Sequence, residues 1–413
     1  MRYADQAMYQ AKLAGRNRYI IANHSSDQQN DLKHNKQQEI VQALVNNEFA
    51  LYYQPKVDMT TGTVYGVEAL IRWIHPQRGL IPPLQFLPLI DSNDLDIRIG
   101  NWVINEALQQ LEKWTQQGIE LEVSINISSH HILSDSFYQK LDATLALYPT
   151  INSQKVQLEI LESSALSDIN TISRIIESCQ DNLGIKVALD DFGTGYSSLT
   201  HLKNLSADTI KIDRSFVRNI LGDPGNSAII DGIIGLANAF NRQVIAEGVE
   251  STEHGIALIL MGCISAQGYG IAKPMPAKDI YDWLNAYQSN EQWILCGQRH
   301  QTEKDKKIKL FQLVTNHWKD QFVININVGL NNALDWPISN QKHCHCGIWI
   351  KRALQDMQFD EHILNKLVQA HESTHKLASD IRISYQSGNS APAHTLLPEL
   401  ITAFDDMNTI LTC

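Results

Sequence analysis

The hydrophobic positions of the chain follow two patterns, which separate a long middle region from a C-terminal region. In the middle region, short apolar or β-branched runs alternate with segments of helical periodicity, such as 101–114 and 227–240. These runs cover 51–57, 63–70, 121–128, 155–161, 185–191, 208–213, 243–249 and 263–269. The alternation predicts an α/β fold, a TIM-like (β/α)8 barrel, in preference to an open sheet. Only a turn around 60–62 separates the first two runs, so this pair is predicted to be antiparallel.

The two ends of the chain differ from the middle region. Residues 308–413 contain little Gly or Pro and show helical periodicity, which predicts an all-α domain of the four-helix bundle type. Residues 1–22 are predicted to form an amphipathic helix followed by a short extended piece. The polar stretch 23–38 and the segment 291–307, of which residues 297–307 are polar, are predicted to be linkers. The middle domain is thus placed at 39–290.

Composition and charge exclude several classes of protein. The chain has 413 residues, of which 43% are hydrophobic, so it is long enough for two or three domains and can bury a core. Its 34 basic and 45 acidic residues give a net charge of −11, which argues against a general nucleic-acid-binding surface. An anionic substrate would need local cations or bound metal.

Cysteine usage and the apolar runs bear on location. The six cysteines follow no framework spacing, and the N-terminus lacks the apolar segment of a signal peptide. No run reaches the 18 or so apolar residues of a membrane span. We therefore expect a cytoplasmic protein with no membrane segment in this chain, and a tether through an upstream region stays open.

Polar residues end most of the predicted strands: Glu68, Asn126, Glu159, Asp190, Asp191, Lys211, Glu247 and Gln267. In a barrel these carboxyl ends build the active face. Taken singly, each residue is more simply a solvated or salt-bridged strand end. Together, carboxylates that converge on one pocket would repel one another unless cations neutralise them. Oxygen ligands favour Mg²⁺ or Mn²⁺, and two ions sharing one aspartate would make a phosphoryl-transfer site.

Eight ordered motifs within 39–285 resemble the EAL domains that hydrolyse cyclic di-GMP. They are YYQPKV, GVEALIRWIHPQRGLIPP, INIS, LEILES, ALDDFGTGYSSL, IKIDRSF, IAEGVE and QGYGIAKPMP. The resemblance implies that one Mg²⁺ or Mn²⁺ ion is held by Glu68, Asn126, Glu159 and Asp190. It implies a second ion held by Asp190, Asp191 and Glu247.

The same resemblance assigns roles to the surrounding residues. Lys211 would orient the attacking water, and Gln267 would support the water shell of the second metal. Arg72 would clamp a substrate phosphate, for which its forked guanidinium is suited. Gln54 and Asp213 would also contact the substrate. Glu162 would anchor the DFGTGYSSL loop, which in the family couples metal binding to dimerisation, so a homodimer is expected.

The resemblance implies an active enzyme because no metal-ligand position is substituted. The expected reaction is hydrolysis of cyclic di-GMP to linear pGpG. Two alternatives stay open: a receptor that binds the dinucleotide without turnover, and a zinc-responsive scaffold that uses the barrel as a platform. No duplex nucleic acid is expected as a partner.

Histidines and cysteines in the C-terminal region suggest a second metal site. His371 and His375 are four residues apart, so one helical face presents both imidazoles. Two further features accompany them: His317, and the segment CHCGIW, which begins at Cys344 and approximates a C-x-[Leu/Phe]-G-x-W pattern. In this combination the region resembles the CZB family of zinc-binding helical domains. The resemblance implies a zinc site formed by these four residues. Cys346, His343 and His345 remain alternatives to Cys344, and Trp318 follows the first histidine directly instead of standing three residues later.

Two further expectations concern regulation and the N-terminus. A bundle whose packing depends on zinc could change the dimer contacts or the loop of the barrel, with activation and inhibition both open. The segment ADQAMYQAKLAGRNRY resembles the end of a GGDEF diguanylate cyclase domain. Only that tail is present, so no cyclase activity is expected, and an upstream GGDEF or sensor domain is predicted to be missing from this chain.

Overall fold

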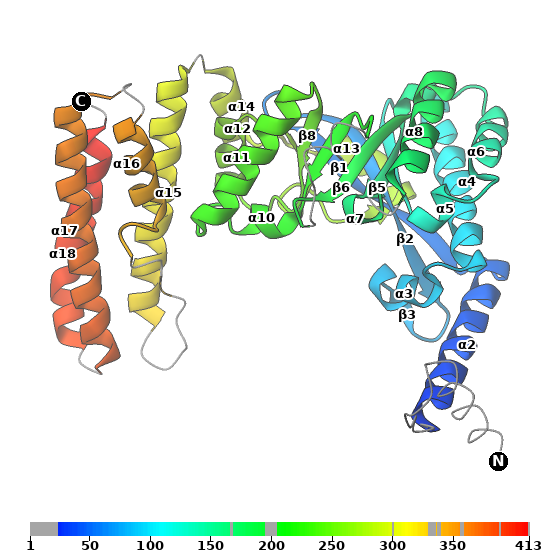
Figure 1. Ribbon diagram of the computed structural model, residues 1–413, viewed down its shortest axis with the longest axis horizontal. Helices are drawn as coiled ribbons and strands as arrows, with labels where there is room; N and C mark the ends of the chain where they lie inside the picture. The colour runs from blue at the N-terminus through cyan, green and yellow to red at the C-terminus, as the bar shows by residue number, and fades with distance from the viewer. Residues whose placement is uncertain are drawn as a thin grey trace, which may run out of the picture.

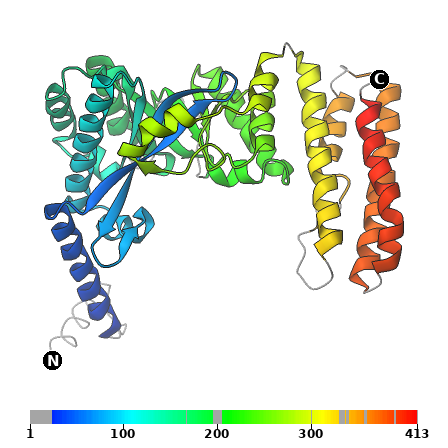
Figure 2. The same ribbon diagram turned by 180° about the vertical axis from the view of Figure 1, so that it is seen from behind.

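The computed structural model describes residues 24–165, 168–194, 205–299, 301–328, 336, 340–355, 359–387 and 390–411. A barrel coated with helices lies at the centre, and a helical bundle stands beside it (Figure 1). Helix α2 (His24–Val45) extends away on the opposite side, and the view from behind shows the same arrangement (Figure 2). Within the described residues, no helix has both the length and the apolar character needed to cross a membrane.

Eight strands close the barrel in the order β1, β9, β8, β7, β6, β5, β4, β2, and β2 returns to β1. Strand β1 runs antiparallel to both of its barrel neighbours, and the other neighbouring pairs are parallel. Two short strands, β3 and β10, pair at the margin. The predicted TIM-like barrel with an antiparallel first pair is confirmed. The strands are β1 (Phe49–Asp58), β2 (Thr63–His75), β3 (Gly79–Ile81), β4 (Glu122–Ile127), β5 (Val156–Leu161), β6 (Lys186–Phe192), β7 (Thr209–Ile212), β8 (Gln243–Ala246), β9 (Ser265–Ala266) and β10 (Met275–Pro276).

Helices cover the outside of the barrel, so its strands are buried on both faces. Tyr53 of β1, for example, packs edge-on against Trp114 with ring centroids 4.8 Å apart. The neighbouring residue Gln54 faces the interior instead, because successive side chains of a strand point to opposite faces. The helices of this part are α3 (Leu87–Ile90), α4 (Asp94–Gln116), α5 (Ser129–Ile132), α6 (Phe137–Ala146), α7 (Glu162–Ala165), α8 (Ile169–Leu183), α10 (Arg214–Arg218), α11 (Pro224–Ala239), α12 (Thr252–Met261), α13 (Ala277–Ala286) and α14 (Glu291–Gln298), with short 3-10 turns η1 (Pro83–Gln85) and η2 (Ser153–Lys155).

Helix boundaries follow local chemistry. Helix α4 begins where the side chain of Asn93 accepts a hydrogen bond from the Leu95 amide at 2.8 Å, and two aspartates occupy its first turn. Helix α8 ends at Gly184, whose φ of 70° belongs to the left-handed region that favours glycine. These signals determine where α4 begins and where α8 ends.

Two stretches predicted as linkers are helical instead. Residues 24–45 form α2, which contains several Gln residues, good helix formers, and whose Ile40 is buried against the barrel. Residues 291–298 form α14, which Trp293 fixes to α12 by burial and by a 2.8 Å hydrogen bond to the Thr252 carbonyl. Residues 23–38 are polar, so composition alone did not indicate the first helix, whereas residues 291–298 include Trp293, Ile294 and Leu295, an apolar signal that the linker prediction missed. The predicted segment 1–22 lies outside the described residues.

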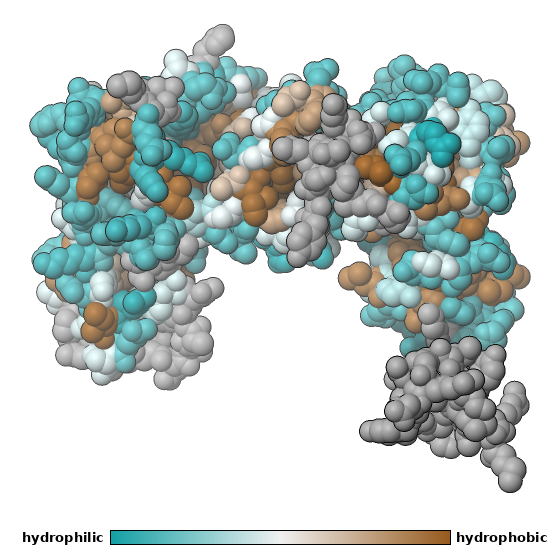
Figure 3. Space-filling view, viewed as in Figure 1, coloured by the Kyte–Doolittle hydropathy of each residue, from teal (hydrophilic) through white to brown (hydrophobic). Residues whose placement is uncertain are grey.

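The described residues of the C-terminal region form four helices, as the sequence predicts. They are α15 (Glu303–Val328), α16 (His345–Gln355), α17 (Glu361–Gln386) and α18 (Ser390–Ile410). Their core is aromatic and aliphatic: Trp318 packs against Phe404 with ring centroids 4.9 Å apart, and Phe311 is fully buried. Hydrophilic residues cover much of the face in Figure 3, with apolar patches on both the bundle and the barrel.

Candidate active site and metal centres

The polar strand ends meet at one end of the barrel. Asn126 of β4 lies beside Glu159 of β5 in the parallel register. Lys211 of β7 pairs with Ile245 of β8, two residues before Glu247. Because parallel strands present their carboxyl ends at the same rim, side chains that are distant in sequence share one pocket.

Asp190 and Asp191 both reach this pocket because the strand is irregular there. Consecutive residues of a regular strand point to opposite faces. The pairing of β6 with β7 shifts register between Leu189 and Phe192, and Asp191 has a φ of 52°. A left-handed conformation is costly for a residue other than glycine and persists where the surrounding structure imposes it. The bulge therefore brings two adjacent carboxylates to one site.

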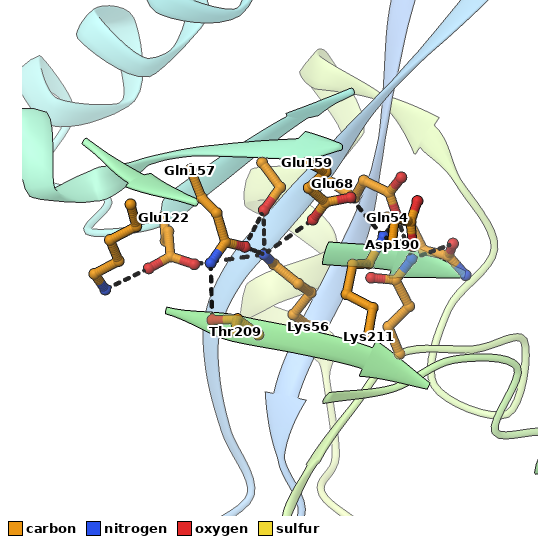
Figure 4. A network of polar contacts seen from close by, with 12 residues as sticks. Gln54, Lys56, Glu68, Glu122, Gln157, Glu159, Asp190, Thr209 and Lys211 are labelled. Carbon is orange, nitrogen blue, oxygen red and sulfur yellow. Dashed lines mark hydrogen bonds and ion pairs between the residues drawn. The ribbon is translucent and has the colours of Figure 1, made fainter. Parts of the chain in front are cut away.

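Lys211 stands at the centre of the carboxylates (Figure 4). Its Nζ lies 2.5 Å from Glu159 Oε2, 2.7 Å from Glu247 Oε1, 3.0 Å from Asp190 Oδ1 and 3.5 Å from Glu68 Oε2. Only 1% of the residue is exposed. Burial disfavours its charged form, but the carboxylates outweigh burial and hold the pKa of Lys211 well above its ordinary value. Lys211 is thus a fixed cation among several anions.

Glu68 is held by two amides as well as by Lys211. Asn126 Nδ2 donates to Glu68 Oε1 at 2.6 Å, and Gln267 Nε2 donates to Glu68 Oε2 at 2.5 Å. Burial opposes ionisation, but Lys211 and these two donors outweigh it and lower the pKa of Glu68. This carboxylate is therefore both ionised and oriented.

Other carboxylates of the site resist ionisation. Burial raises the pKa of Glu159 to about 7 despite the attraction of Lys211. Burial, then the neighbouring charge of Asp190, raises the pKa of Asp191 to about 6. Burial also raises the pKa of Glu247 well above its ordinary value. One lysine is thus insufficient to neutralise the site, and further positive charge would stabilise the ionised forms.

The residues fit the two divalent ions that the sequence predicts. One oxygen each from Glu68, Glu159 and Asp190 lie within 4.8 Å of one another, and so do oxygens from Asp190, Asp191 and Glu247. Both groups share Asp190, as a bridging ligand requires. The buried Oε1 of Glu159 has no hydrogen-bond partner. An all-oxygen donor set with this orphaned atom suits Mg²⁺ or Mn²⁺.

Two of the predicted substrate contacts, Arg72 and Gln54, lie near Glu68. Arg72 is half-buried, with its guanidinium 5.7 Å from the Tyr52 ring, and its Nη1 donates to the Ile71 carbonyl. Gln54 donates to the Ala272 carbonyl at 3.0 Å and accepts from Gln267 at 3.3 Å.

Asp213 and Glu162 occupy defined positions near Asp191. Asp213 Oδ1 accepts from the Ser215 amide at the start of α10, and its carboxyl is hydrogen-bonded to Asp191. Glu162 Oε2 accepts from the Gly193 amide at 2.9 Å, just after the Asp190–Asp191 bulge. The rest of the predicted loop, from residue 195, lies outside the described residues.

The bundle brings three of the four predicted zinc ligands together. Cys344 Sγ lies 3.1 Å from His371 Nε2 and 3.3 Å from His375 Nε2. Hydrogen bonds from Cys346 and the two histidines outweigh burial and lower the pKa of Cys344, which favours the thiolate that metals bind. A thiolate and two imidazoles converging on one point suit zinc.

The other candidates of this region lie outside that group of three ligand atoms. His317 lies outside that group and interacts electrostatically with Glu253 and His254 of α12. Cys346 is buried with its Sγ 3.1 Å from Thr315 Oγ1. His343 is exposed, and His345 turns to the barrel, as described below.

Sequence reasoning missed a second polar layer inside the barrel, beneath the carboxylates. It consists of Lys56, Ser124 and Gln157, with Glu122 beside it (Figure 4). A signal was present, since Lys56 stands two residues after Gln54 and Gln157 two before Glu159, so each pair shares a strand face.

The comparisons with known proteins match the part of the chain that forms the barrel. The EAL domain model matches residues 37–274. The bifunctional diguanylate cyclase/cyclic di-GMP phosphodiesterase MucR of Pseudomonas aeruginosa is 39% identical over 67% of this chain and 40% of its own length. The cyclic di-GMP phosphodiesterase PdeR of Escherichia coli is 36% identical over 70% of this chain and 43% of its own length. The chain therefore spans about two fifths of these relatives.

Solved structures agree. The PaMucR phosphodiesterase in complex with c-di-GMP superposes with a TM-score of 0.57 at 37% identity, covering 60% of this chain and 99% of that one. The EAL domain of Mycobacterium smegmatis DcpA does so with a TM-score of 0.51 at 34% identity, covering 59% of this chain and all of that one.

Proposed function

Since the chain belongs to the EAL domain family, we propose that it hydrolyses cyclic di-GMP to linear pGpG with two divalent cations. The observation that carries the proposal is the convergence of Glu68, Glu159, Asp190, Asp191 and Glu247 in two oxygen groups that share Asp190. A pocket built only to bind a dianionic dinucleotide would not gather so many carboxylates, because they repel phosphates. Bound cations reverse that repulsion.

The roles of the residues follow from their positions. Glu68, Asn126, Glu159 and Asp190 would hold one ion, and Asp190, Asp191 and Glu247 the other. When bound, the ions supply Lewis-acid chemistry: they make water more acidic and offset the negative charge that develops around phosphorus.

The protein's own cations complete the site. Lys211, hydrogen-bonded to Glu159 and paired with Glu247, would donate to the attacking water and hold it in line with the phosphorus. Arg72, which is half-buried and interacts electrostatically with Glu68, would bind a phosphate through two parallel N–H groups. Gln54, Gln267 and Asp213 would orient the substrate and its surrounding water.

Chromatography of the product tests the proposal. Purified protein is incubated with cyclic di-GMP and Mn²⁺, and pGpG is followed over time beside Glu68→Ala and the exposed control Asp142→Ala. We expect pGpG from the wild-type protein and from the control, and none from Glu68→Ala. Dinucleotide binding by the wild-type protein with no pGpG would favour the receptor alternative and overturn the proposal.

We further propose that the bundle binds zinc and thereby regulates the barrel. Cys344, His371 and His375 supply three converging ligands. The residue after Cys344 touches the barrel: His345 Nε2 lies 3.2 Å from the Ile220 carbonyl and 3.1 Å from Ser227 Oγ. A shift of Cys344 on binding metal would thus move a direct contact with the loop between α10 and α11.

The remainder of the junction leaves space for such a shift. A cavity of about 560 Å³ lies between α11 and helices α15 and α16. The test compares hydrolysis rate and oligomeric state with zinc added or stripped at fixed Mn²⁺, in wild type and in Ser227→Ala. Regulation is supported if zinc changes the hydrolysis rate or the oligomeric state of the wild type and changes that of Ser227→Ala less. It is refuted if zinc changes neither quantity in the wild type.

A homodimer and an upstream GGDEF domain complete the proposal. The resemblance of residues 1–22 to a GGDEF tail supports the upstream domain, as does the greater length of the relatives. Light scattering of the purified chain with and without Mn²⁺ measures its oligomeric state, and a monomer under both conditions would refute the dimer.

A further inference from the structure

The polar layer beneath the active site contains a buried cation. Gln157 lies one inward step below Glu159 on β5, and Ser124 lies one inward step below Asn126 on β4. Lys56 of β1 enters the same layer from across the barrel, and Figure 4 shows it between Gln157 and Glu159. Branched apolar side chains usually fill a barrel interior, so a lysine here is costly unless its charge is used.

Three hydrogen bonds fix the ammonium group. Lys56 Nζ donates to Ser124 Oγ at 2.5 Å, to Gln157 Oε1 at 3.2 Å and to Glu122 Oε1 at 3.4 Å. These acceptors match the three N–H bonds of an ammonium. Because only 1% of Lys56 is exposed, water does not compete for it. The position of this charge is therefore determined by the fold.

The same ammonium faces the metal-binding pocket. Its Nζ lies 3.9 Å from Glu159 Oε1, the oxygen that has no hydrogen-bond partner. The other oxygen of Glu159 contacts Lys211. Glu159 thus lies between two cations, one within the pocket and one below it, at a depth where solvent screens little.

The strand next to β1 leaves room for the lysine stem. Gly66 of β2 stands one inward step below Glu68. A Cβ at Gly66 would lie 3.3 Å from Lys56 Cε and only 2.8 Å from the Glu122 carbonyl oxygen. The absence of a side chain at Gly66 allows the long Lys56 chain to pass.

We propose that Lys56 is a positioning residue that acts as a permanent internal counter-ion for Glu159 and sets the affinity of the active site for divalent cations. The proposal rests on the proposed function, in which Glu159 is a metal ligand. In the metal-free protein, Lys56 and Lys211 together offset the repulsion among the carboxylates. When divalent ions bind, the charge of Lys56 stays in place and opposes them. The residue therefore stabilises the metal-free fold and limits how tightly the ions bind.

Lys56→Met tests this, because it removes the charge and keeps an unbranched apolar stem. In EDTA we expect a lower melting temperature than in wild type. At about pH 8.5, calorimetric titration should show Mn²⁺ binding at least about tenfold more tightly, because the repulsion between a unit charge and a divalent ion is lost and even full screening by water would leave an effect of that size. The rise in melting temperature caused by Mn²⁺ should also exceed that of wild type.

Ser124→Ala is the matched control, because it removes a hydrogen bond of Lys56 and changes no charge. It should lower the melting temperature and leave Mn²⁺ affinity near the wild-type value. If Lys56→Met is unfolded in EDTA, Lys56→Gln replaces it, since the amide retains a donor for Gln157.

The outcomes separate the two proposals. If Lys56→Met binds Mn²⁺ as tightly as wild type or more weakly, the proposed role of Lys56 is overturned and the proposed function is unaffected. Failure of the wild-type protein to bind Mn²⁺ overturns the proposed function. A variant and control that both bind more tightly would show a packing effect and would also overturn the role of Lys56.

Discussion

Glu159→Gln is expected to stabilise the metal-free protein although it removes a predicted metal ligand. The carboxylate is 1% exposed, and burial raises its pKa to about 7 from the ordinary 4.5. Ionised Glu159 is therefore less stable in the folded protein than in the unfolded chain. Glutamine has nearly the same shape and carries no charge. Lys211 keeps three other carboxylates within 3.5 Å, so it is not left unpaired.

The sign and size of the effect depend on pH. The favourable contribution of protonated Glu159 is fully present below pH 4.5 and is lost as pH rises through about 7. The difference between those two values corresponds to about 3 kcal/mol. We thus expect the free energy of unfolding of Glu159→Gln to exceed that of wild type by about 3 kcal/mol near pH 8 and to be close to it near pH 5.

Urea unfolding in EDTA at the two pH values measures this difference, with the exposed carboxylate variant Glu120→Gln as the control. With Mn²⁺ the order should reverse, because wild type gains binding energy that the variant lacks. A variant less stable than wild type in EDTA near pH 8 would refute the reasoning. An equal gain at both pH values would show that packing, and not charge, causes the change.

Other expected outcomes concern packing and the bundle. In Gly255→Ala the new Cβ would lie 2.2 Å from Trp293 Nε1, so the free energy of unfolding should fall by about 2 kcal/mol. In Gly232→Ala the new Cβ would meet nothing within 4 Å, so the free energy of unfolding should rise by about 0.5 kcal/mol. Urea unfolding measures both variants, and an equal loss of stability in the two would contradict this account. In the bundle, His371→Ala should lose zinc while His317→Ala retains it, measured as metal content after gel filtration. Loss of zinc from both variants would contradict a site of three converging ligands.

Sequence reasoning predicted the barrel and the convergence of polar residues at one of its rims because both depend on local patterns. Alternating apolar runs and helical segments identify βα units, and Glu68 and Glu159 stand at the ends of such runs. Parallel strands then place these ends together whatever the details of packing. The antiparallel first pair was predictable for the same reason, from the short turn between two strands.

The linkers and His317 were less accessible to sequence reasoning. Helix α14 is held by burial of Trp293 against α12, a contact between segments that are far apart in the chain. His317 resembles a zinc ligand in the sequence but lies outside the converging group and interacts electrostatically with Glu253 of α12. Helical spacing determines which residues share a face, whereas the orientation of that face depends on neighbouring helices.

The sequence by itself determined the chemistry available to this protein: a barrel rim with carboxylates, one lysine and one arginine, and a helix carrying two histidines. Only the tertiary structure decided how these groups meet. The bulge that turns both Asp190 and Asp191 inward, the central place of Lys211 and the pairing of Lys56 with Glu159 depend on barrel closure. Closure brings strands that are far apart in the chain within a few ångströms, and at that range burial and charge determine each group's behaviour.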